Sequence, residues 1–343
     1  MIRKLLVAVS AAACLASVAT PAMAKQDAPK TKRVVVLVSG TAATTPFTTP
    51  KHACKKGFSA GNTWEFLRED LTKRGYKVFT APASVNGVKV KETASETDGP
   101  FSECPDQLAA KMTINSVGPV DRSASSLARF IKYLHKNYGV TNVDLVGHSL
   151  GGFIGRAGIR EVELNKIPVT FNSYATLGSP WDGTYMAAPP DPADPLSACR
   201  GFAVCQAFIG PLMQVPGIEM LIAMLNPKNT PAWNDNQKGF LDGIPVSLFS
   251  GTYFTQPGGS ADMWPNDGVA QESSALADGV SKKVLPHSRC YVYPLTHSLF
   301  VSRGIGQPDN TSLTWNSEVG ADLAKSINGA GKALKKQDRI GCP

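Results

Sequence analysis

Short runs of apolar and β-branched residues alternate along the chain with segments in which apolar residues recur every three or four positions. Continuous apolar runs of this length are typical of strands that are buried on both faces of a parallel sheet. They predict strands at residues 34–38, 77–80, 142–146, 169–177, 245–250 and 289–293. Because these strands alternate with helical segments, the pattern predicts an α/β fold with about six mostly parallel strands and helices on both faces of the sheet.

The helical segments are marked by one apolar face and by a glycine where a helix should end. They predict helices at 63–74, 121–138, 150–164 and 316–336, of which the first two are followed by Gly75 and Gly139. The dipeptide Asn86-Gly87 is typical of a hairpin turn. Residues 183–243 show no clear periodicity and form too long a connection for an ordinary loop, which predicts an inserted lid or cap.

The first 24 residues have the three parts of a secretory signal peptide. Arg3 and Lys4 precede a short apolar run, and Ala22-Met23-Ala24 matches the small-residue cleavage pattern. The run is shorter than the ~20 residues that span a bilayer, so we expect cleavage near Ala24 and a soluble protein that is extracellular or periplasmic. Lipidation at Cys14 is a weaker alternative. Residues 25–343 should form one domain, because no linker divides them.

Composition and charge narrow the class of protein. Hydrophobic residues make up 43% and charged residues 18% of the 343 positions, which fits a globular domain and excludes a disordered, collagen-like or coiled-coil chain. The net charge of +8 is scattered, without a basic run that carries aromatic residues, so nucleic acid is not an expected partner. We expect a monomer.

Six cysteines remain once the signal peptide is removed. None of them lies in a C-x-x-C pair or has a histidine at ligand spacing, so we expect no metal and no other cofactor. Cysteines in an exported chain point to disulfides. We favour the pairs Cys54–Cys104, Cys199–Cys205 and Cys290–Cys342, because each joins sequence neighbours across a predicted loop.

The motif Gly147-His148-Ser149-Leu150-Gly151 carries the sharpest chemical signal. A Gly-x-Ser-x-Gly pattern alone is weak evidence, but here it follows a predicted strand and precedes a predicted helix, as a nucleophile elbow requires. The sharp turn needs neighbours without side chains, which Gly147 and Gly151 supply. We therefore expect Ser149 to be a nucleophile.

A nucleophilic serine needs a base that takes its proton. His297 follows the last predicted strand, so it should lie at the same carboxyl edge of the sheet as Ser149, where ligands bind in open α/β sheets. His148 should pack beneath the elbow instead. The remaining histidines, His52, His135 and His287, lie at positions that fit the role less well.

A carboxylate should orient the imidazole of His297 and stabilise the imidazolium that forms during the reaction. Asp267 is favoured, because it follows the strand at 245–250 and precedes His297. Asp262 and Asp182 are the alternatives. Two backbone N–H groups should stabilise an oxyanion, one from Leu150 at the start of the helix and one from Thr41 in the loop after the first strand.

With these residues assembled, the sequence resembles the secreted bacterial lipases and esterases of the α/β-hydrolase superfamily, in particular class 2-like members with a small sheet. The likeness is carried by residues 34–41, 143–152, 175–184 and 267–297, and by the chain order Ser149, Asp267, His297. The resemblance implies the α/β-hydrolase fold and ester hydrolysis through an acyl-enzyme. It also implies that Trp181, in the segment Ser179-Pro180-Trp181, lines the substrate site.

The leading hypothesis is a secreted serine carboxylic-ester hydrolase that acts on hydrophobic esters, in solution or at a lipid or polymer surface. Met186, Met213, Met220 and Met224 in the segment 183–243 suit an acyl chain, although the segment could equally be a helical hairpin packed on the core. Alternatives are a polyester depolymerase, an acyltransferase or thioesterase with the same triad, and a catalytically silent binding protein of the cell surface.

Overall fold

The computed structural model describes residues 33–54, 62–90, 104, 107–188, 194, 196–329 and 339–342. The predicted signal peptide, residues 1–24, lies outside the described residues. In the described part of the chain, no helix is long and apolar enough to span a membrane.

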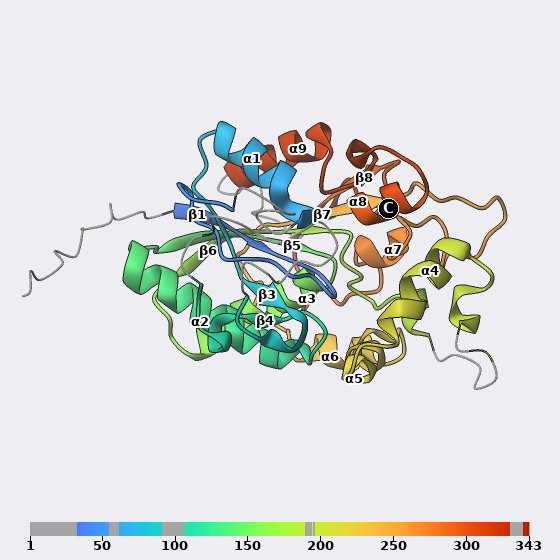
Figure 1. The fold of residues 1–343 in the computed structure, drawn as a ribbon, viewed down its shortest axis with the longest axis horizontal. Helices are drawn as coiled ribbons and strands as arrows, with labels where there is room; N and C mark the ends of the chain where they lie inside the picture. The colour runs from blue at the N-terminus through green and yellow to red at the C-terminus, as the bar shows by residue number, and fades with distance from the viewer. Residues whose placement is uncertain are drawn as a thin grey trace, which may run out of the picture.

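A seven-stranded sheet with parallel pairing throughout forms the centre of the molecule (Figure 1). Its strands, in spatial order, are β2 (Val78–Thr80), β1 (Arg33–Val38), β5 (Asn142–His148), β6 (Thr170–Leu177), β7 (Val246–Gly251), β8 (Ser288–Tyr293) and β9 (Arg339–Ile340). The first six correspond to the six predicted strands. The prediction missed β9, because a strand of two residues is too short to leave a hydrophobic pattern.

Helices cover both faces of this sheet, as predicted. The helices α2 (Val120–Tyr138) and α3 (Leu150–Leu164) lie on one face, and α1 (Glu65–Lys73) and α9 (Ser317–Gly329) lie on the other (Figure 1). Alternate residues of β1 divide between two cores: Val36 packs with α2 and α3, and Leu37 packs with α1 and α9. This two-sided burial explains the continuous apolar run. The predicted last helix reached residue 336, but 330–338 lie outside the described residues.

The hairpin predicted at Asn86-Gly87 is wrong. Both residues do have positive φ, 65° and 64°, as a tight turn requires. However, β3 (Ala83–Ser84) pairs with β4 (Ile114–Asn115) in parallel, so the two strands form a small second sheet instead of a hairpin. The turn is stabilised from a distance in the sequence, because the side-chain oxygen of Asn115 accepts a hydrogen bond from the backbone N–H of Asn86.

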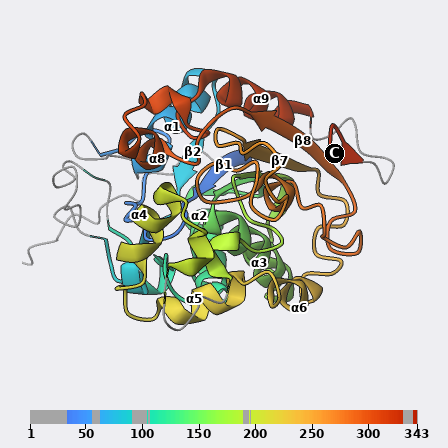
Figure 2. The ribbon, with the colours of Figure 1, turned by 90° about the vertical axis from the view of Figure 1, so that its right-hand side faces the viewer.

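The segment 183–243 contains more helix than its sequence pattern indicated. Its helices are α4 (Ala203–Leu212), α5 (Ile218–Leu225) and α6 (Thr230–Asp235), with short 3₁₀ turns at Tyr185–Ala187 and Ser197–Cys199. In Figures 1 and 2, α5 and α6 lie on the opposite side of the molecule from α1 and α9, and α4 lies between these two sides, at the right-hand end of Figure 1. The remaining short helices are α7 (Glu272–Ala275) and α8 (Leu299–Gly304), with 3₁₀ turns at Asn62–Trp64, Val85–Gly87, Ala110–Met112 and Asp309–Thr311.

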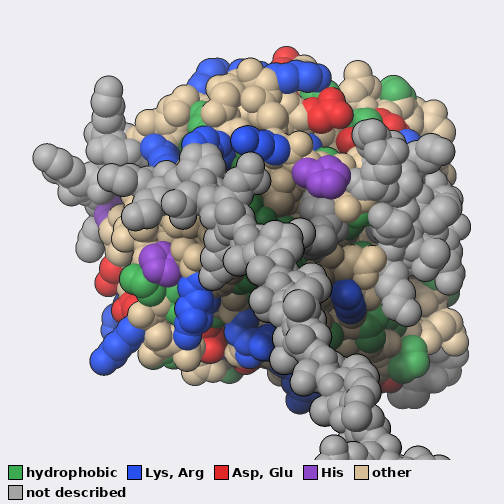
Figure 3. All heavy atoms as spheres, turned by 60° about the vertical axis from the view of Figure 1, so that its left-hand side comes forward, with side chains coloured by type: hydrophobic (Ala, Val, Ile, Leu, Met, Phe, Trp, Pro, Cys, Tyr) green, Lys and Arg blue, Asp and Glu red, His purple; other side chains and the backbone are tan. Residues whose placement is uncertain are grey.

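Three disulfides join the cysteines in the predicted pairs: Cys54–Cys104, Cys199–Cys205 and Cys290–Cys342. The last of these holds the chain end that bears β9 against β8, whose residues Ser288 and Arg289 pair with β9. Among the described residues on the face seen in Figure 3, lysine and arginine side chains lie in several separate groups, and a few acidic side chains lie near some of them.

Candidate active site

Ser149 occupies the sharp turn between β5 and α3. Its backbone has φ 55° and ψ −129°, a conformation that residues with a side chain rarely adopt and that costs about 1–3 kcal/mol. The surrounding chain holds it there. Its N–H donates to the carbonyl oxygen of Leu177 at 2.9 Å, and its own carbonyl oxygen accepts from the Ser179 hydroxyl at 2.7 Å. The structure therefore contains the predicted elbow.

The glycines of the motif are required by close backbone contacts. A Cβ atom on Gly147 would lie 2.5 Å from the carbonyl oxygen of Gly151, and one on Gly151 would overlap the carbonyl oxygen of Val38. A Cβ on Gly40, in the loop after β1, would lie 2.7 Å from the Cβ of Ser149 and 3.3 Å from its hydroxyl oxygen. That loop therefore passes directly against the serine.

His297 and Asp267 form a buried pair. Nδ1 of His297 lies 2.7 Å from Oδ2 of Asp267, and the backbone N–H of His297 donates to the Asp267 carbonyl oxygen, also at 2.7 Å. The two side chains are 4% and 0% exposed. The second carboxylate oxygen accepts from the N–H groups of Val269 and Ala270 at 2.9 and 2.7 Å. Asp267 is thus fixed in place and holds Nδ1, which leaves Nε2 as the ring nitrogen available for proton transfer.

His148 connects this pair to the elbow. Its Nε2 donates to the carbonyl oxygen of His297 at 3.0 Å, and the two ring centres lie 4.5 Å apart. Burial and the nearby His297 hold the pKa of His148 well below its usual value of 6.5, so its ring stays neutral. His148, the residue just before Ser149, thus packs against the His297 ring and holds the segment that carries His297 next to the turn.

Gly178 brings the end of β6 against the same pair. A Cβ at this position would lie 2.7 Å from Oδ2 of Asp267 and 2.8 Å from Nδ1 of His297. The preceding residue, Leu177, holds the N–H of Ser149. Serine, imidazole and carboxylate therefore gather at the carboxyl ends of neighbouring strands. The sequence places Gly178 directly after a buried strand, but no pattern revealed that it lies against Asp267 and His297.

The alternative acids lie elsewhere. Asp262 is exposed and forms an ion pair with Arg200, which lowers the pKa of Asp262 to about 2. One oxygen of Asp182 accepts a hydrogen bond from the N–H of Gly279 at 2.9 Å. Of the other histidines, His135 contacts the carbonyl oxygen of Val140 at the end of α2.

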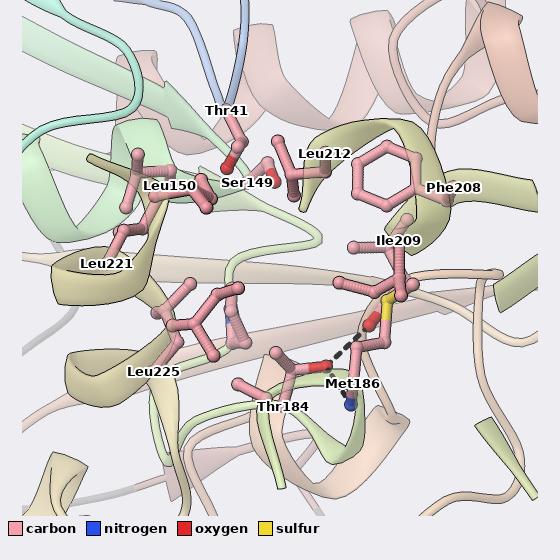
Figure 4. A pocket seen from close by; sticks show the side chains of 15 residues that line it. Thr41, Ser149, Leu150, Thr184, Met186, Phe208, Ile209, Leu212, Leu221 and Leu225 are labelled. Atoms are coloured by element: carbon pink, nitrogen blue, oxygen red, sulfur yellow. Dashed lines mark hydrogen bonds between the residues drawn. The ribbon is translucent and has the colours of Figure 1, made fainter. Parts of the chain in front are cut away.

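An apolar pocket opens beside Ser149 (Figure 4). Thr41 and Leu150 line it together with the serine, and Figure 4 shows the Thr41 hydroxyl directed toward Ser149. The N–H of Leu150 belongs to the first turn of α3, where backbone donors have no partner within the helix. Both residues predicted to supply oxyanion donors, Thr41 and Leu150, thus line the same pocket as Ser149.

Helices α4 and α5 supply nearly half of the pocket wall and contribute only apolar side chains: Phe208, Ile209, Leu212, Ile218, Leu221, Ile222 and Leu225. Besides Thr41, Ser149 and Leu150, the other lining residues are Pro180, Val269 and three from the start of the segment 183–243, Thr184, Met186 and Ala187. The cavity volume is about 30 Å³, which is room for about two water molecules. Among the described residues, no group of three or more His, Cys, Asp and Glu side chains could hold a metal ion.

Trp181 is not among the residues that line this pocket; its neighbour Pro180 is. The buried indole donates to the hydroxyl of Thr176 at 3.0 Å and lies under the guanidinium of Arg156, 4.3 Å from the ring centre. Phe153 and Trp233 also flank Arg156, and burial lowers the pKa of Arg156 to about 9. Arg156 of α3 thus links Trp181 to Trp233 of α6.

A family model described as an alpha/beta hydrolase of unknown function (DUF915) matches residues 109–194, which include Ser149. The structure is similar to the mature lipase BlEst2 of Bacillus licheniformis, with 13% identity, a TM-score of 0.48, and coverage of 87% of this chain and 93% of that one. An esterase from Exiguobacterium antarcticum is 13% identical, with a TM-score of 0.43 and coverage of 87% and 92%.

A hydrolase from Oleispira antarctica is 12% identical, with a TM-score of 0.43 and coverage of 89% of this chain and 97% of that one. No curated protein sequence matches the chain. The family model and the parallel sheet with its strand–serine–helix turn agree on the architecture. The chain has the α/β-hydrolase fold.

Proposed function

We propose that the chain is a serine carboxylic-ester hydrolase that cleaves hydrophobic esters through an acyl-enzyme on Ser149. The proposal is carried by one observation: the buried His297–Asp267 pair, 2.7 Å apart, lies against the residue that precedes an elbow serine. A neutral imidazole held at Nδ1 by a carboxylate is the arrangement that allows a serine hydroxyl to act as a nucleophile.

In the first step, the hydroxyl oxygen of Ser149 attacks the ester carbonyl carbon while its proton passes to Nε2 of His297. Asp267 stabilises the imidazolium. The N–H groups of Thr41 and Leu150 donate to the oxyanion of the tetrahedral intermediate. When the intermediate collapses, the C–O bond to the alcohol breaks and the imidazolium gives its proton to the leaving oxygen. Water then attacks the acyl-enzyme by the same route and releases the carboxylic acid.

The pocket supports the proposal of an apolar acyl group, because none of the described residues that line it is charged. A cavity of about 30 Å³ is much smaller than the ~300–1,000 Å³ of typical ligand sites. We therefore infer that α4 and α5 move apart or outward when substrate enters. In this proposal residues 183–243 act as a lid over Ser149 within the hydrolase domain of residues 25–343.

We further propose that the protein is exported after cleavage near Ala24 and acts as a monomer without a nucleic-acid partner. Three disulfides support an oxidising compartment, since disulfides persist in secreted and periplasmic proteins and are rare in the cytosol.

Hydrolysis of p-nitrophenyl esters of increasing acyl length by the purified protein and by Ser149→Ala tests the proposal. We expect hydrolysis by the wild type and its loss in the variant, with unchanged thermal unfolding. Activity that survives the substitution would reject Ser149 as the nucleophile. Further assays separate the alternatives. An added alcohol reveals an acyltransferase and a thioester substrate reveals a thioesterase. An emulsion reveals a lipase and a polyester film reveals a polyesterase. A folded wild type without turnover on any of these substrates would favour the binding protein.

A further inference from the structure

The loop that carries Thr41 is closed at its base by two buried hydroxyl groups. Oγ of Ser39 lies 2.8 Å from Oγ1 of Thr45, and both residues are 0% exposed. Within the loop, Gly40 lies against Ser149 and Thr41 lines the pocket beside it. The hydroxyl pair thus joins the two ends of the short segment that would supply one of the two oxyanion donors.

The same loop is docked on the small second sheet. The N–H of Ala42 donates to the carbonyl oxygen of Ser116, which follows β4, at 3.0 Å. Thr45 and Ala83 of β3 exchange two backbone hydrogen bonds of 2.8 and 3.0 Å. Ala42 has φ 56°, a strained conformation for alanine that persists only when the surrounding structure holds it.

We propose that Ser39 and Thr45 are positioning residues that hold the Thr41 N–H in place for the oxyanion, with the β3–β4 sheet as their support. The inference rests on the proposed function. Neither hydroxyl touches the substrate. They act through the loop, and the donor they position is used fully only when negative charge has developed on the carbonyl oxygen. Their loss should therefore slow the chemical step and leave substrate binding nearly unchanged.

A second buried hydroxyl pair provides a matched control. Oγ1 of Thr48 donates to Oγ1 of Thr80 at 2.7 Å, and both residues are again 0% exposed. This pair contacts the guanidinium of Arg68 in α1 instead of the loop that contains Thr41. Thr45→Val and Thr80→Val each remove one hydroxyl of a buried pair and replace it with a methyl group of nearly equal size. They should affect stability alike and catalysis differently.

The experiment compares wild type, Ser39→Ala, Thr45→Val, Thr45→Ser and Thr80→Val. For each, kcat and KM are measured on a p-nitrophenyl ester, together with the inhibition constant of an alkyl trifluoromethyl ketone, which Ser149 converts to a tetrahedral oxyanion adduct. We expect Ser39→Ala and Thr45→Val to lower kcat by about 10- to 100-fold, a fraction of the effect of losing an oxyanion donor outright, with KM changed by less than about threefold.

The inhibition constant should rise in Ser39→Ala and Thr45→Val in parallel with the loss of kcat. Thr45→Ser, which keeps the hydroxyl, should restore most of the activity, and Thr80→Val should keep the wild-type kcat. Equal kcat losses in Thr45→Val and Thr80→Val, or losses that follow melting temperature alone, would overturn the positioning role. A wild-type protein that hydrolyses no ester would instead reject the proposed function on which the inference rests.

Discussion

Replacing Gly178 by alanine should disrupt the contact between His297 and Asp267 without removing either side chain. The new Cβ would lie 2.7 Å from the Asp267 carboxylate and 2.8 Å from Nδ1 of His297. Real Cβ atoms essentially never approach other atoms this closely, so the Asp267 carboxylate or the His297 ring must shift, and we expect the 2.7 Å hydrogen bond between them to be distorted. The variant therefore probes the arrangement of the proposed triad while Ser149, His297 and Asp267 all remain present.

The size of the effect follows from what the carboxylate does. Losing the group that orients a catalytic imidazole costs up to about 10⁴ in kcat, and a displacement of about 1 Å already costs about 10². We therefore expect kcat of Gly178→Ala to fall by about 10² to 10⁴, which is about 2.7 to 5.4 kcal/mol of transition-state stabilisation. The backbone contributes a separate cost to folding, about 1–2 kcal/mol, because Gly178 has φ 56°.

Gly243→Ala is the matched control. Gly243 also has positive φ, 75°, but a Cβ added there would have no atom within 4 Å. The residue precedes β7, so it lies at the amino end of that strand, whereas Gly178 follows the carboxyl end of β6. Gly243→Ala should lose only the backbone contribution to the unfolding free energy, about 1–2 kcal/mol, and keep the wild-type kcat. Both variants are assayed for ester hydrolysis and for urea unfolding. If Gly178→Ala, folded, retained the kcat of Gly243→Ala, the inferred role of the His297–Asp267 contact would be wrong.

Three further predictions concern single side chains. Asp267→Asn should lower kcat about 10⁴-fold, whereas Asp262→Asn, which alters an exposed ion pair, should leave kcat unchanged. Steady-state kinetics of the two variants therefore distinguish the two candidate acids. The pKa of His148 is depressed in the folded protein, so below about pH 6.5 the unfolded chain binds a proton that the folded chain does not, and the unfolding free energy should fall by up to about 1.4 kcal/mol per pH unit as the pH drops. Urea unfolding between pH 5 and 7 should therefore show a weaker dependence of the unfolding free energy on pH in His148→Gln than in the wild type. An equal dependence in the two proteins would contradict this prediction. Arg156→Lys should lose about 2 kcal/mol of unfolding free energy, because lysine lacks the planar guanidinium that stacks among three aromatic rings. A loss below about 0.5 kcal/mol in chemical denaturation would refute the stacking contribution.

The parts of the fold that could be predicted from the sequence are those in which a local sequence pattern is compatible with only one structure. The run at 34–38 predicted a central strand because its side chains are buried alternately on both faces of the sheet. The position of His297 after the last long strand predicted which sheet edge it occupies, because parallel strands bring their carboxyl ends to the same edge. Chain order then favoured Asp267, which the structure places against His297.

Other features depend on contacts between distant residues and left no local pattern. The Asn86-Gly87 turn is held by the side chain of Asn115, which belongs to β4, the parallel partner of β3. Helix α5 escaped notice because apolar residues occupy almost every position of Ile218–Leu225, so no polar face marks the helical period. Trp181 follows the pocket residue Pro180 in the sequence, yet its indole packs under Arg156. Only the packed structure reveals this orientation of the side chain.

Covalent labelling tests the central claim, that Ser149 is activated by His297, most directly. The protein is treated with a fluorophosphonate, the rate of adduct formation is followed by intact mass, and the adduct is located by peptide mass spectrometry. We predict a single adduct on Ser149, with a labelling rate that falls by about 10² or more in a folded His297→Ala variant. An adduct on another residue, or equal labelling rates in the two proteins, would contradict the claim.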